Sequence, residues 1–388
     1  MSVLPWREIC PMDERMRFIT LVNESEETFA ELCERFSISR KTGYKWVKRY
    51  EERGVVGLEE RGSAAHSCPH RTAGDVLDRI IELRKEHPKW GPKKLRARLV
   101  TLGIEAVPAA STIGDALKKH GLIRPRRRRV HPPMHPQPIV ATEHPNDTWC
   151  VDFKGHFALG DRMRCHPLTI TDHTTRYLLK CEGLSKADEL GVRPHFERGF
   201  REFGLPTRMR SDNGPPFATL GIGGLSALSV WWIQLGITPE RIEPGHPEQN
   251  GRHERMHRTL KDEVASPPAA SMSEQQRAFD RFRRVYNTER PHEALDMKTP
   301  DSRYTPSRRA MPEKPRSPEY DDTKKVRKLD DQGRLQIGAT KTLVSRLLAR
   351  EPVGLEQLDE DRWKLYYGPV LLAEITCKNK EVRFEKHR

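Results

Sequence analysis

The feature that most constrains this chain is a set of three acidic residues, each in a distinctive local sequence, within positions 148–261. Asp152 lies in Trp-Cys-Val-Asp-Phe, a run that alternates like a β-strand. Asp212 follows a second predicted strand, in Ser-Asp-Asn-Gly-Pro-Pro-Phe. Glu254 lies in Asn-Gly-Arg-His-Glu-Arg-Met-His, at the start of a predicted helix. Hard divalent cations prefer oxygen ligands, so the three carboxylates are candidates for holding two such ions for phosphoryl transfer.

The charge of the chain points to a polyanionic partner. Its 388 residues carry a formal net charge of +14, which favours nucleic acid over a membrane surface. A chain of this length is expected to form about two to four domains. No apolar run approaches the roughly 20 residues that span a bilayer, and the N-terminus lacks the apolar core of a signal peptide. The seven cysteines are scattered without a Cys-x-x-Cys pair, which predicts reduced thiols in an intracellular protein.

Residues 1–62 are predicted to form a helix-turn-helix domain. Apolar residues at helical spacing predict three helices within 12–53, the second of them capped by Thr28. The third is expected to turn Tyr44 and Trp46 inward and its basic side outward, where it would enter the major groove of DNA. An ordinary three-helix core with a solvated basic face remains the alternative for this segment. The expected DNA contacts are Arg40, Lys41, Thr42, Lys45 and Lys48.

The same pattern recurs in residues 72–124. Three further helices are predicted, and Pro92 lies in the first turn of the second, where a missing N–H costs little. Two such units in tandem favour DNA recognition over a plain helical core. The expected contacts on the third helix are Ser111, Thr112 and Lys118.

Residues 125–145 are predicted to be a basic, proline-rich linker. Its prolines keep the chain extended, and its positive charge suits phosphates or a minor groove. A solvated tail without a DNA contact is the alternative. The dense basic run consists of Arg126, Arg127, Arg128 and Arg129.

Residues 146–310 are predicted to form an α/β core. Three strands, a helix, a strand, a helix, a strand and a helix follow one another, which is the order of the ribonuclease-H-like fold. Asp152 lies within the first strand, and Asp212 lies at the C-terminal end of a later strand, where α/β sheets place ligand-binding groups. The predicted elements are strands at 149–157, 168–171, 177–180, 207–211 and 237–242, and helices at 186–203, 225–235 and from 249 onward.

Four motifs in this order resemble the DDE transposases of bacterial insertion sequences and the retroviral integrases. The resemblance covers residues 146–310 by motif and the rest of the chain by its layout. It implies that Asp152, Asp212 and Glu254 are the catalytic and metal-binding residues, that the cofactor is two Mg²⁺ ions, and that Mn²⁺ substitutes. The motifs are Trp149-x-x-Asp-Phe, Ser211-Asp-Asn-Gly-Pro-x-Phe, Pro247-x-x-Asn-Gly-x-x-Glu-Arg-x-His-Arg-Thr-Leu-Lys and Tyr286-Asn-Thr-Glu-Arg-Pro-His.

The resemblance also implies a reaction and its partners. Such an enzyme binds the terminal inverted repeats of its transposon, uses water to free a 3′-OH at the end, and joins that hydroxyl to target DNA. Pairing two ends calls for at least a dimer. A cytoplasmic, nucleoid-associated bacterial protein is expected. Two alternatives stay open: a non-catalytic DNA-binding regulator derived from a transposase, and a ribonuclease-H-type nuclease without strand transfer.

Two glutamates compete for the third acidic position. The family often has 35 residues between its second aspartate and its glutamate, and this count from Asp212 selects Glu248. The family's glutamate also follows the glycine of its Pro-x-x-x-Gly segment by three positions, and Gly251 then selects Glu254. We choose Glu254 because a helix holds it steady, whereas Glu248 lies in the loop before that helix.

The helix of Glu254 carries a row of basic residues. They are expected to lie on phosphates: Arg252, Arg255, Arg258 and Lys261. His253 and His257 are interpreted as surface histidines on this DNA-facing helix, with a catalytic role as the alternative.

Residues 321–388 are predicted to form a small β-barrel of five short strands, separated by acidic and glycine-containing turns. Its expected role is contact with DNA or with another subunit. The predicted fold is therefore multidomain: all-α helix-turn-helix domains, an α/β ribonuclease-H-like catalytic core and a C-terminal small β-barrel.

Overall fold

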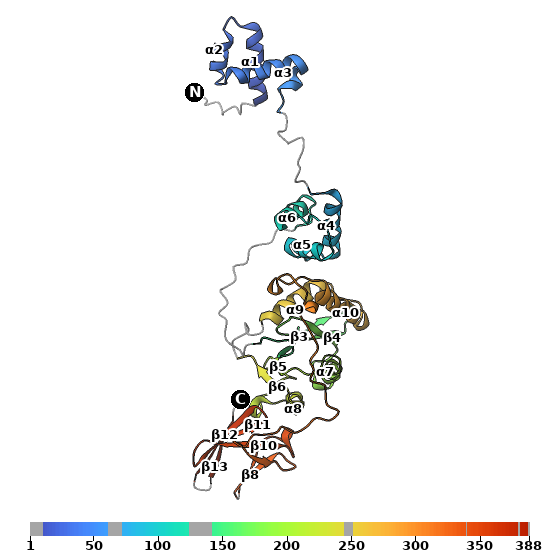
Figure 1. Cartoon of the computed structure of the whole chain (residues 1–388), viewed down its shortest axis with the longest axis vertical. Helices are drawn as coiled ribbons and strands as arrows, with labels where there is room; N and C mark the ends of the chain where they lie inside the picture. Colours follow the sequence, from blue (N-terminus) through green and yellow to red (C-terminus); the bar gives the residue numbers. More distant parts are fainter. Residues whose placement is uncertain are drawn as a thin grey trace. The chain divides into compact units, whose positions relative to one another are not determined.

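A computed structural model describes residues 11–60, 72–123, 142–243, 251–338, 340–378 and 381–386 (Figure 1). The chain divides into two compact units, Met1–Arg71 and Thr72–Arg388. Two predicted features lie outside the described residues: the arginine run 126–129 and Glu248. Within the described parts of the chain, no helix is long and apolar enough to cross a membrane.

The first unit contains the three predicted helices: α1 (Pro11–Glu24), α2 (Phe29–Arg35) and α3 (Arg40–Arg53). Thr28 caps α2 as predicted, and the side chain of Glu31 completes a capping box. The prediction that Tyr44 points inward is wrong, because its side chain is 62% exposed. Helix α3 buries Gly43 and Trp46, which leaves Tyr44 on the outer side, stacked on Phe29.

The second unit begins with the other predicted helical set: α4 (Gly74–Glu86), α5 (Pro92–Thr101) and α6 (Ala110–Lys119). Pro92 occupies the first turn of α5, as expected. Ile80, Leu95 and Ile113, one from each helix, are fully buried and hold the three helices around a common apolar core.

The core is a mixed sheet in the order β4-β3-β1-β5-β6, with the short β2 paired to β3. Strand β1 runs antiparallel to β3 and parallel to β5, and β5 runs parallel to β6. The order of elements along the chain agrees with the predicted α/β core. The strands are β1 (Thr148–Phe153), β2 (Phe157–Ala158), β3 (Arg164–Asp172), β4 (Leu178–Leu184), β5 (Arg208–Ser211) and β6 (Thr238–Arg241).

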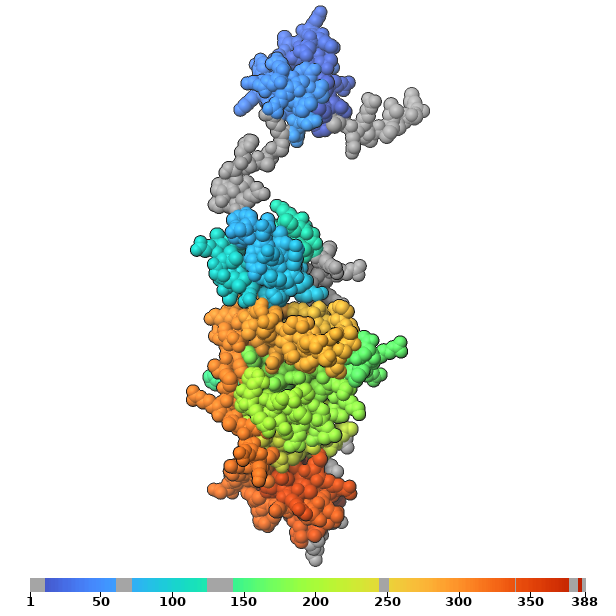
Figure 2. All heavy atoms as spheres, turned by 90° about the vertical axis from the view of Figure 1, so that its right-hand side faces the viewer, coloured from blue at the N-terminus to red at the C-terminus, as the bar shows by residue number. Residues whose placement is uncertain are grey.

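Helices cover both faces of this sheet (Figure 1). Helices α7 (Glu189–Phe203) and α8 (Ala227–Gln234) pack through Phe200 and Trp232 into one apolar cluster. Helices α9 (Gly251–Val264) and α10 (Met272–Thr288) pack through Leu260 and Phe279 into a second cluster on the opposite face. In Figure 2 the orange surface of α10 borders the green surface of α7, and both helices contact β4.

Helix α10 was not predicted, although its sequence carries the signal. Phe279, Phe282 and Tyr286 recur at helical spacing and are all buried. Its C-terminal end continues into the fourth motif. There the Asn287 side chain accepts a hydrogen bond from the Leu178 N–H (2.9 Å) and donates one to the Leu178 carbonyl (3.0 Å). This residue therefore fastens α10 to β4.

The small β-barrel predicted for residues 321–388 is not confirmed. The described strands form an open antiparallel sheet in the order β13-β12-β11-β10-β7, whose outer strands β13 and β7 do not pair with each other, and a separate β8-β9 hairpin. The apolar face of the sheet packs on Ile222 and Ile233 of the core, which takes the place of barrel closure. The strands are β7 (Lys325–Lys328), β8 (Arg334–Ile337), β9 (Thr340–Leu343), β10 (Pro352–Gln357), β11 (Arg362–Tyr367), β12 (Val370–Lys378) and β13 (Glu381–Lys386).

Candidate active site

Asp152 lies near the end of the central strand β1 and points to the side of the sheet that α9 covers. Successive side chains of a strand face opposite sides. Trp149 and Val151 enter the cluster beneath α7 and α8, so Asp152 falls on the other face. Its carboxylate is largely buried, with 19% of the side chain exposed.

Asp212 lies directly after β5, the parallel neighbour of β1. The parallel pairing of β1 with β5 runs as far as Cys150 and Arg210, two residues before Asp152 and Asp212 in their segments. The backbone N–H of Gly214 donates to Asp212 Oδ1 (3.2 Å), which holds the carboxylate in one orientation. Strand β5 thus fixes the chain before Asp212, and the hydrogen bond from the Gly214 N–H fixes its carboxylate.

Glu254 lies in the first turn of α9, and its residue is exposed. The positive end of the helix dipole favours a carboxylate there. Buried His253, Met256 and Leu260 fix the rotation of α9 against the sheet. The sequence alternative, Glu248, lies outside the described residues.

The charges of the three acidic residues interact. Burial, together with the carboxylates of Asp212 and Glu254, raises the pKa of the Asp152 carboxyl to about 7, although the backbone N–H of Phe153 and the charge of Lys154 act in the opposite direction. Asp212, at the end of β5, and Glu254, on α9, therefore lie near enough to Asp152 on β1 for their charges to act on it. An acidic group of this kind, rich in oxygen donors, fits a divalent cation of the Mg²⁺ type.

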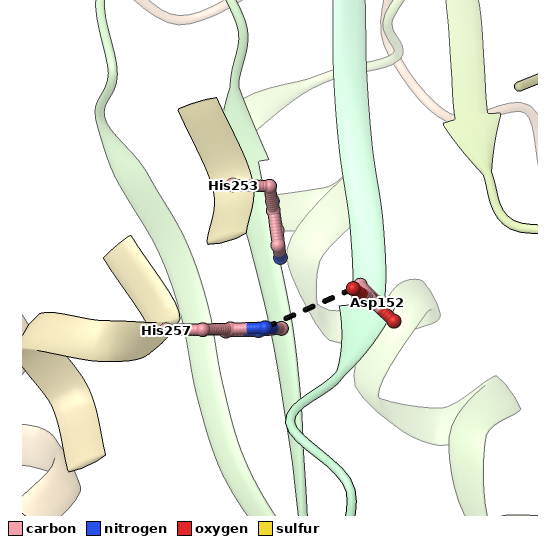
Figure 3. A group of neighbouring side chains, drawn as sticks. All are labelled: Asp152, His253 and His257. Carbon is pink, nitrogen blue, oxygen red and sulfur yellow. Dashed lines mark ion pairs between the residues drawn. The ribbon is translucent and has the colours of Figure 1, made fainter. Parts of the chain in front are cut away.

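The two histidines of α9 correct the sequence interpretation. His253 and His257 were expected on the surface, but they are 2% and 5% exposed. Both rings insert between α9 and the sheet, and His257 Nδ1 faces Asp152 Oδ2 at 3.7 Å (Figure 3). One atom from each of Asp152, His253 and His257 lies within 4.8 Å of the others.

Hydrogen bonds from β3 hold these histidines. The Thr169 hydroxyl contacts Nε2 of both His253 and His257 (2.7 Å each) and donates to the Asp152 carbonyl (3.1 Å). The Thr171 hydroxyl contacts His253 Nδ1 (2.9 Å). Burial lowers the pKa of His253 to about 3 and that of His257 to about 2, so both rings are neutral at physiological pH.

The predicted DNA contacts on α9 are on the surface. Arg252 also donates to the carbonyl of His173 (3.2 Å), which ties its guanidinium to the end of β3. The remaining basic side chains leave α9 with a positive outer face beside the acidic group. The exposed residues are Arg252, Arg255, Arg258 and Lys261.

The predicted contacts on α3 and α6 differ in their surroundings. Thr42 is half-buried, and its hydroxyl and backbone N–H both meet the Ser39 side chain, so this residue belongs to the cap of α3. Lys45 lies over the Trp46 ring, 4.7 Å from its centre. The remaining predicted contacts are exposed: Arg40, Lys41, Lys48, Ser111, Thr112 and Lys118.

Tyr44 is a candidate contact that the sequence reasoning missed. It lies one helical turn after Arg40 and one before Lys48, and it is exposed with them. That spacing of four residues was the available signal. An aromatic ring among basic residues on a helix of this kind suits contact with DNA bases.

Two kinds of domain family match the chain. The integrase core domain matches residues 142–247 and, through a second family model, residues 235–300. Homeodomain-like domains match residues 12–59 and 42–117. The first pair of matches spans the three acidic residues, and the second pair spans the helical sets.

Proteins of bacterial insertion elements are similar to this chain. The IS407 uncharacterized 31.7 kDa protein of Burkholderia multivorans is 27% identical over 264 residues, which cover 67% of this chain and 91% of that protein. The IS476 uncharacterized 39.2 kDa protein of Xanthomonas euvesicatoria is 27% identical over 244 residues, which cover 61% of this chain and 67% of that protein.

Solved structures of viral integrases also align. The HTLV-2 integrase catalytic core domain in complex with magnesium is 15% identical, covers 42% of this chain and 98% of its own, and has a TM-score of 0.34. The simian T-cell lymphotropic virus intasome is 15% identical, covers 79% and 96%, and has a TM-score of 0.37.

Proposed function

Because this chain belongs to the bacterial insertion-sequence transposases of the integrase superfamily, we propose that it is a DDE transposase with Asp152, Asp212 and Glu254 as its catalytic, metal-binding residues. It hydrolyses the end of its transposon to give a 3′-OH and joins that hydroxyl to target DNA by two-metal-ion transesterification. The observation that supports the proposal is that Asp212 and Glu254, from separate segments, both raise the pKa of the partly buried Asp152 carboxyl. Like charges gathered at a partly buried site destabilise the fold unless a cation binds there.

The chain's own residues supply ligands and position. Asp152, fixed in the central strand, would hold the two ions together with Asp212 and Glu254. Bound Mg²⁺ supplies an activated oxygen nucleophile near neutral pH and stabilises the charge on the leaving oxygen. The exposed arginines of α9 stand next to this group and bind phosphates of the DNA strand, which orients the scissile bond. No side chain is needed as a covalent nucleophile.

Recognition of the ends belongs to the helical parts. We assign binding of the terminal inverted repeats to the domains at 1–62 and 72–124, through the exposed faces of α3 and α6, and phosphate contact to the linker at 125–145. Catalysis belongs to the core at 146–310. The sheet within 321–388 would contact DNA or a second subunit, and pairing two ends calls for at least a dimer. Such a protein acts on the bacterial nucleoid in the cytoplasm.

A strand-transfer assay tests the proposal. Purified full-length protein is given a pre-nicked duplex that carries the native terminal repeat with a free 3′-OH, and supercoiled plasmid as target, with and without Mg²⁺. We expect joined product that requires Mg²⁺ and disappears with Glu254→Gln. Mn²⁺ is expected to support the same reaction.

The controls separate this proposal from its rivals. Glu248→Gln is expected to retain most activity, and the reverse pattern would move the third ligand to Glu248. Tight binding to the end without nicking or joining, in either metal, would favour a DNA-binding regulator. Nicking without joining would favour a nuclease of the ribonuclease-H type.

A further inference from the structure

The nitrogen of His257 that faces Asp152 has an unusual position. Nδ1 and the carboxylate Oδ2 are 3.7 Å apart, which is longer than a hydrogen bond. A charged imidazolium beside a carboxylate would close to hydrogen-bond length. The two atoms are therefore near each other without a proton shared between them.

The Thr169 hydroxyl fixes which nitrogen of His257 carries the proton. This hydroxyl has one hydrogen and three partners: the Asp152 carbonyl, His253 Nε2 and His257 Nε2. The carbonyl can only accept, so the hydroxyl donates to it and accepts from both rings. Each ring is then protonated on Nε2. In a neutral imidazole this leaves a lone pair on Nδ1.

Counting the hydrogen bonds of each ring nitrogen also distinguishes the two histidines. His253 Nδ1 accepts from the Thr171 hydroxyl at 2.9 Å, so both of its nitrogens are used in hydrogen bonds within the protein. His257 Nδ1 instead lies 3.7 Å from Asp152 Oδ2 (Figure 3). A nitrogen lone pair and a carboxylate oxygen this near each other repel, and a cation held by both turns that repulsion into attraction.

We propose that His257 Nδ1 joins Asp152 as a ligand of one divalent ion in the active site, while His253 is a positioning residue that holds the ring of its neighbour. The inference rests on the proposed function and deepens it. A neutral, buried imidazole whose other nitrogen is hydrogen-bonded is the usual form of a histidine ligand. Nitrogen ligands suit transition metals better than Mg²⁺, so the site should favour Mn²⁺ over Mg²⁺ more strongly than carboxylates alone would.

Pulsed EPR of Mn²⁺ bound to the full-length protein tests this assignment, together with Mn²⁺ titration by calorimetry. We expect a nitrogen coupled to the bound Mn²⁺. His257→Gln can still donate to Thr169 but lacks the Nδ1 ligand, so it should lose the coupling and bind Mn²⁺ about tenfold more weakly. His257→Asn can place an amide oxygen near the position of Nδ1; it should lose the coupling but keep more of the affinity. His253→Gln should keep the coupling.

The outcomes separate this inference from the proposed function. A nitrogen signal that survives His257→Gln, or that disappears with His253→Gln alone, overturns the assignment of His257. Mn²⁺ binding that depends on Asp152 but shows no coupled nitrogen also overturns it, and leaves the carboxylate site intact. Mn²⁺ binding that is unchanged in Asp152→Asn contradicts the proposed active site itself, and the role of His257 with it.

Discussion

Helices α3 and α9 have the same length and both carry several basic residues, but they are fixed in different ways. Each has 14 residues. Helix α3 buries Gly43 and Trp46 in an apolar core, and the polar contacts of its first turn end at Ser39. Helix α9 buries two histidines among its apolar residues and fastens them to β3 by hydrogen bonds.

Under the proposed function, this difference distinguishes a helix that would read DNA, α3, from a helix that would position catalytic residues, α9. An apolar stripe stabilises α3 without directing any of its exposed residues at a particular atom of the protein. Hydrogen bonds are directional, so the histidines of α9 fix its rotation and depth against β3. That rotation decides where Glu254 stands relative to Asp152. The hydrogen-bonded buried histidines of α9 therefore hold the exposed Glu254 in a fixed position, as a functional site requires.

The largest effect that would separate the roles of α3 and α9 is expected from the loss of an acidic residue of the candidate active site. Asp152→Asn, Asp212→Asn and Glu254→Gln should each reduce strand joining by about a thousandfold or more, because each removes a ligand needed in the transition state. Binding of the terminal repeat should stay within about twofold, since these residues are far in the sequence from the reading helices. Strand-transfer and gel-shift assays on the same preparations measure the two quantities.

Substitutions on the outer face of α3 should instead weaken binding to the terminal repeat. Arg40→Ala and Tyr44→Ala should each weaken binding to the terminal repeat about tenfold and lower its preference over unrelated DNA. Lys48→Ala is the matched control: a phosphate contact weakens binding to all sequences alike and reduces the salt dependence. If Tyr44→Ala leaves both affinity and preference unchanged, the exposed ring has no part in reading.

Most of the architecture was predictable because it follows from periodicity. The helices of both helical sets and Thr28 as a cap lie where spacing placed them. The strands of the core do so as well, except that the predicted strand 149–157 is divided into β1 and β2. Helix α10 carries the same signal and was overlooked. Closure of the C-terminal strands into a barrel was not predictable, because alternation marks each strand but says nothing of which edges pair. Ile222 and Ile233, distant in sequence, cover the face that closure would have buried.

The candidate site was predictable in its acids and not in its histidines. Asp152, Asp212 and Glu254 stand in motifs that can be read along the chain. The burial of His253 and His257 depends on β3, more than eighty residues earlier in the sequence, as the Thr169 contacts show. On α9 the histidines share a face with Met256 and Leu260. That spacing could have indicated that they point inward.

A smaller effect tests how α9 is held. Thr169→Val keeps the shape of the side chain but leaves two buried ring N–H groups without their acceptor. We expect a loss of about 2 kcal/mol in the free energy of unfolding of the core, measured by urea denaturation. The same change at the exposed Thr340 should have almost no effect. Equal stability of Thr169→Val and the wild type would show that apolar packing alone holds α9, as it does α3.

The smallest effect concerns the pH dependence of the metal-free protein. The pKa of Asp152 is about 7 in the folded chain and about 3.9 when unfolded. Because the folded-state pKa is the higher one, the stabilising contribution of the protonated carboxyl is complete below pH 4 and is lost as the pH rises through 7. Asp152→Asn resembles the protonated form at every pH. The difference between the two pKa values corresponds to at most about 4 kcal/mol, and solvent screening reduces this at a side chain that is 19% exposed. In EDTA the variant should therefore match the wild type near pH 4 and exceed its stability by about 1–2 kcal/mol at pH 8.

Mg²⁺ should reverse that order. At pH 8 a bound cation neutralises the carboxylates and stabilises the wild type through its preference for the folded state, whereas Asp152→Asn has lost a ligand. Asp322→Asn, at an exposed position, should follow the wild type in both conditions. If Asp152→Asn is no more stable than the wild type at pH 8 in EDTA, repulsion among the three carboxylates does not destabilise the fold. The acidic group beside α9 would then be an ordinary surface feature like the charged face of α3.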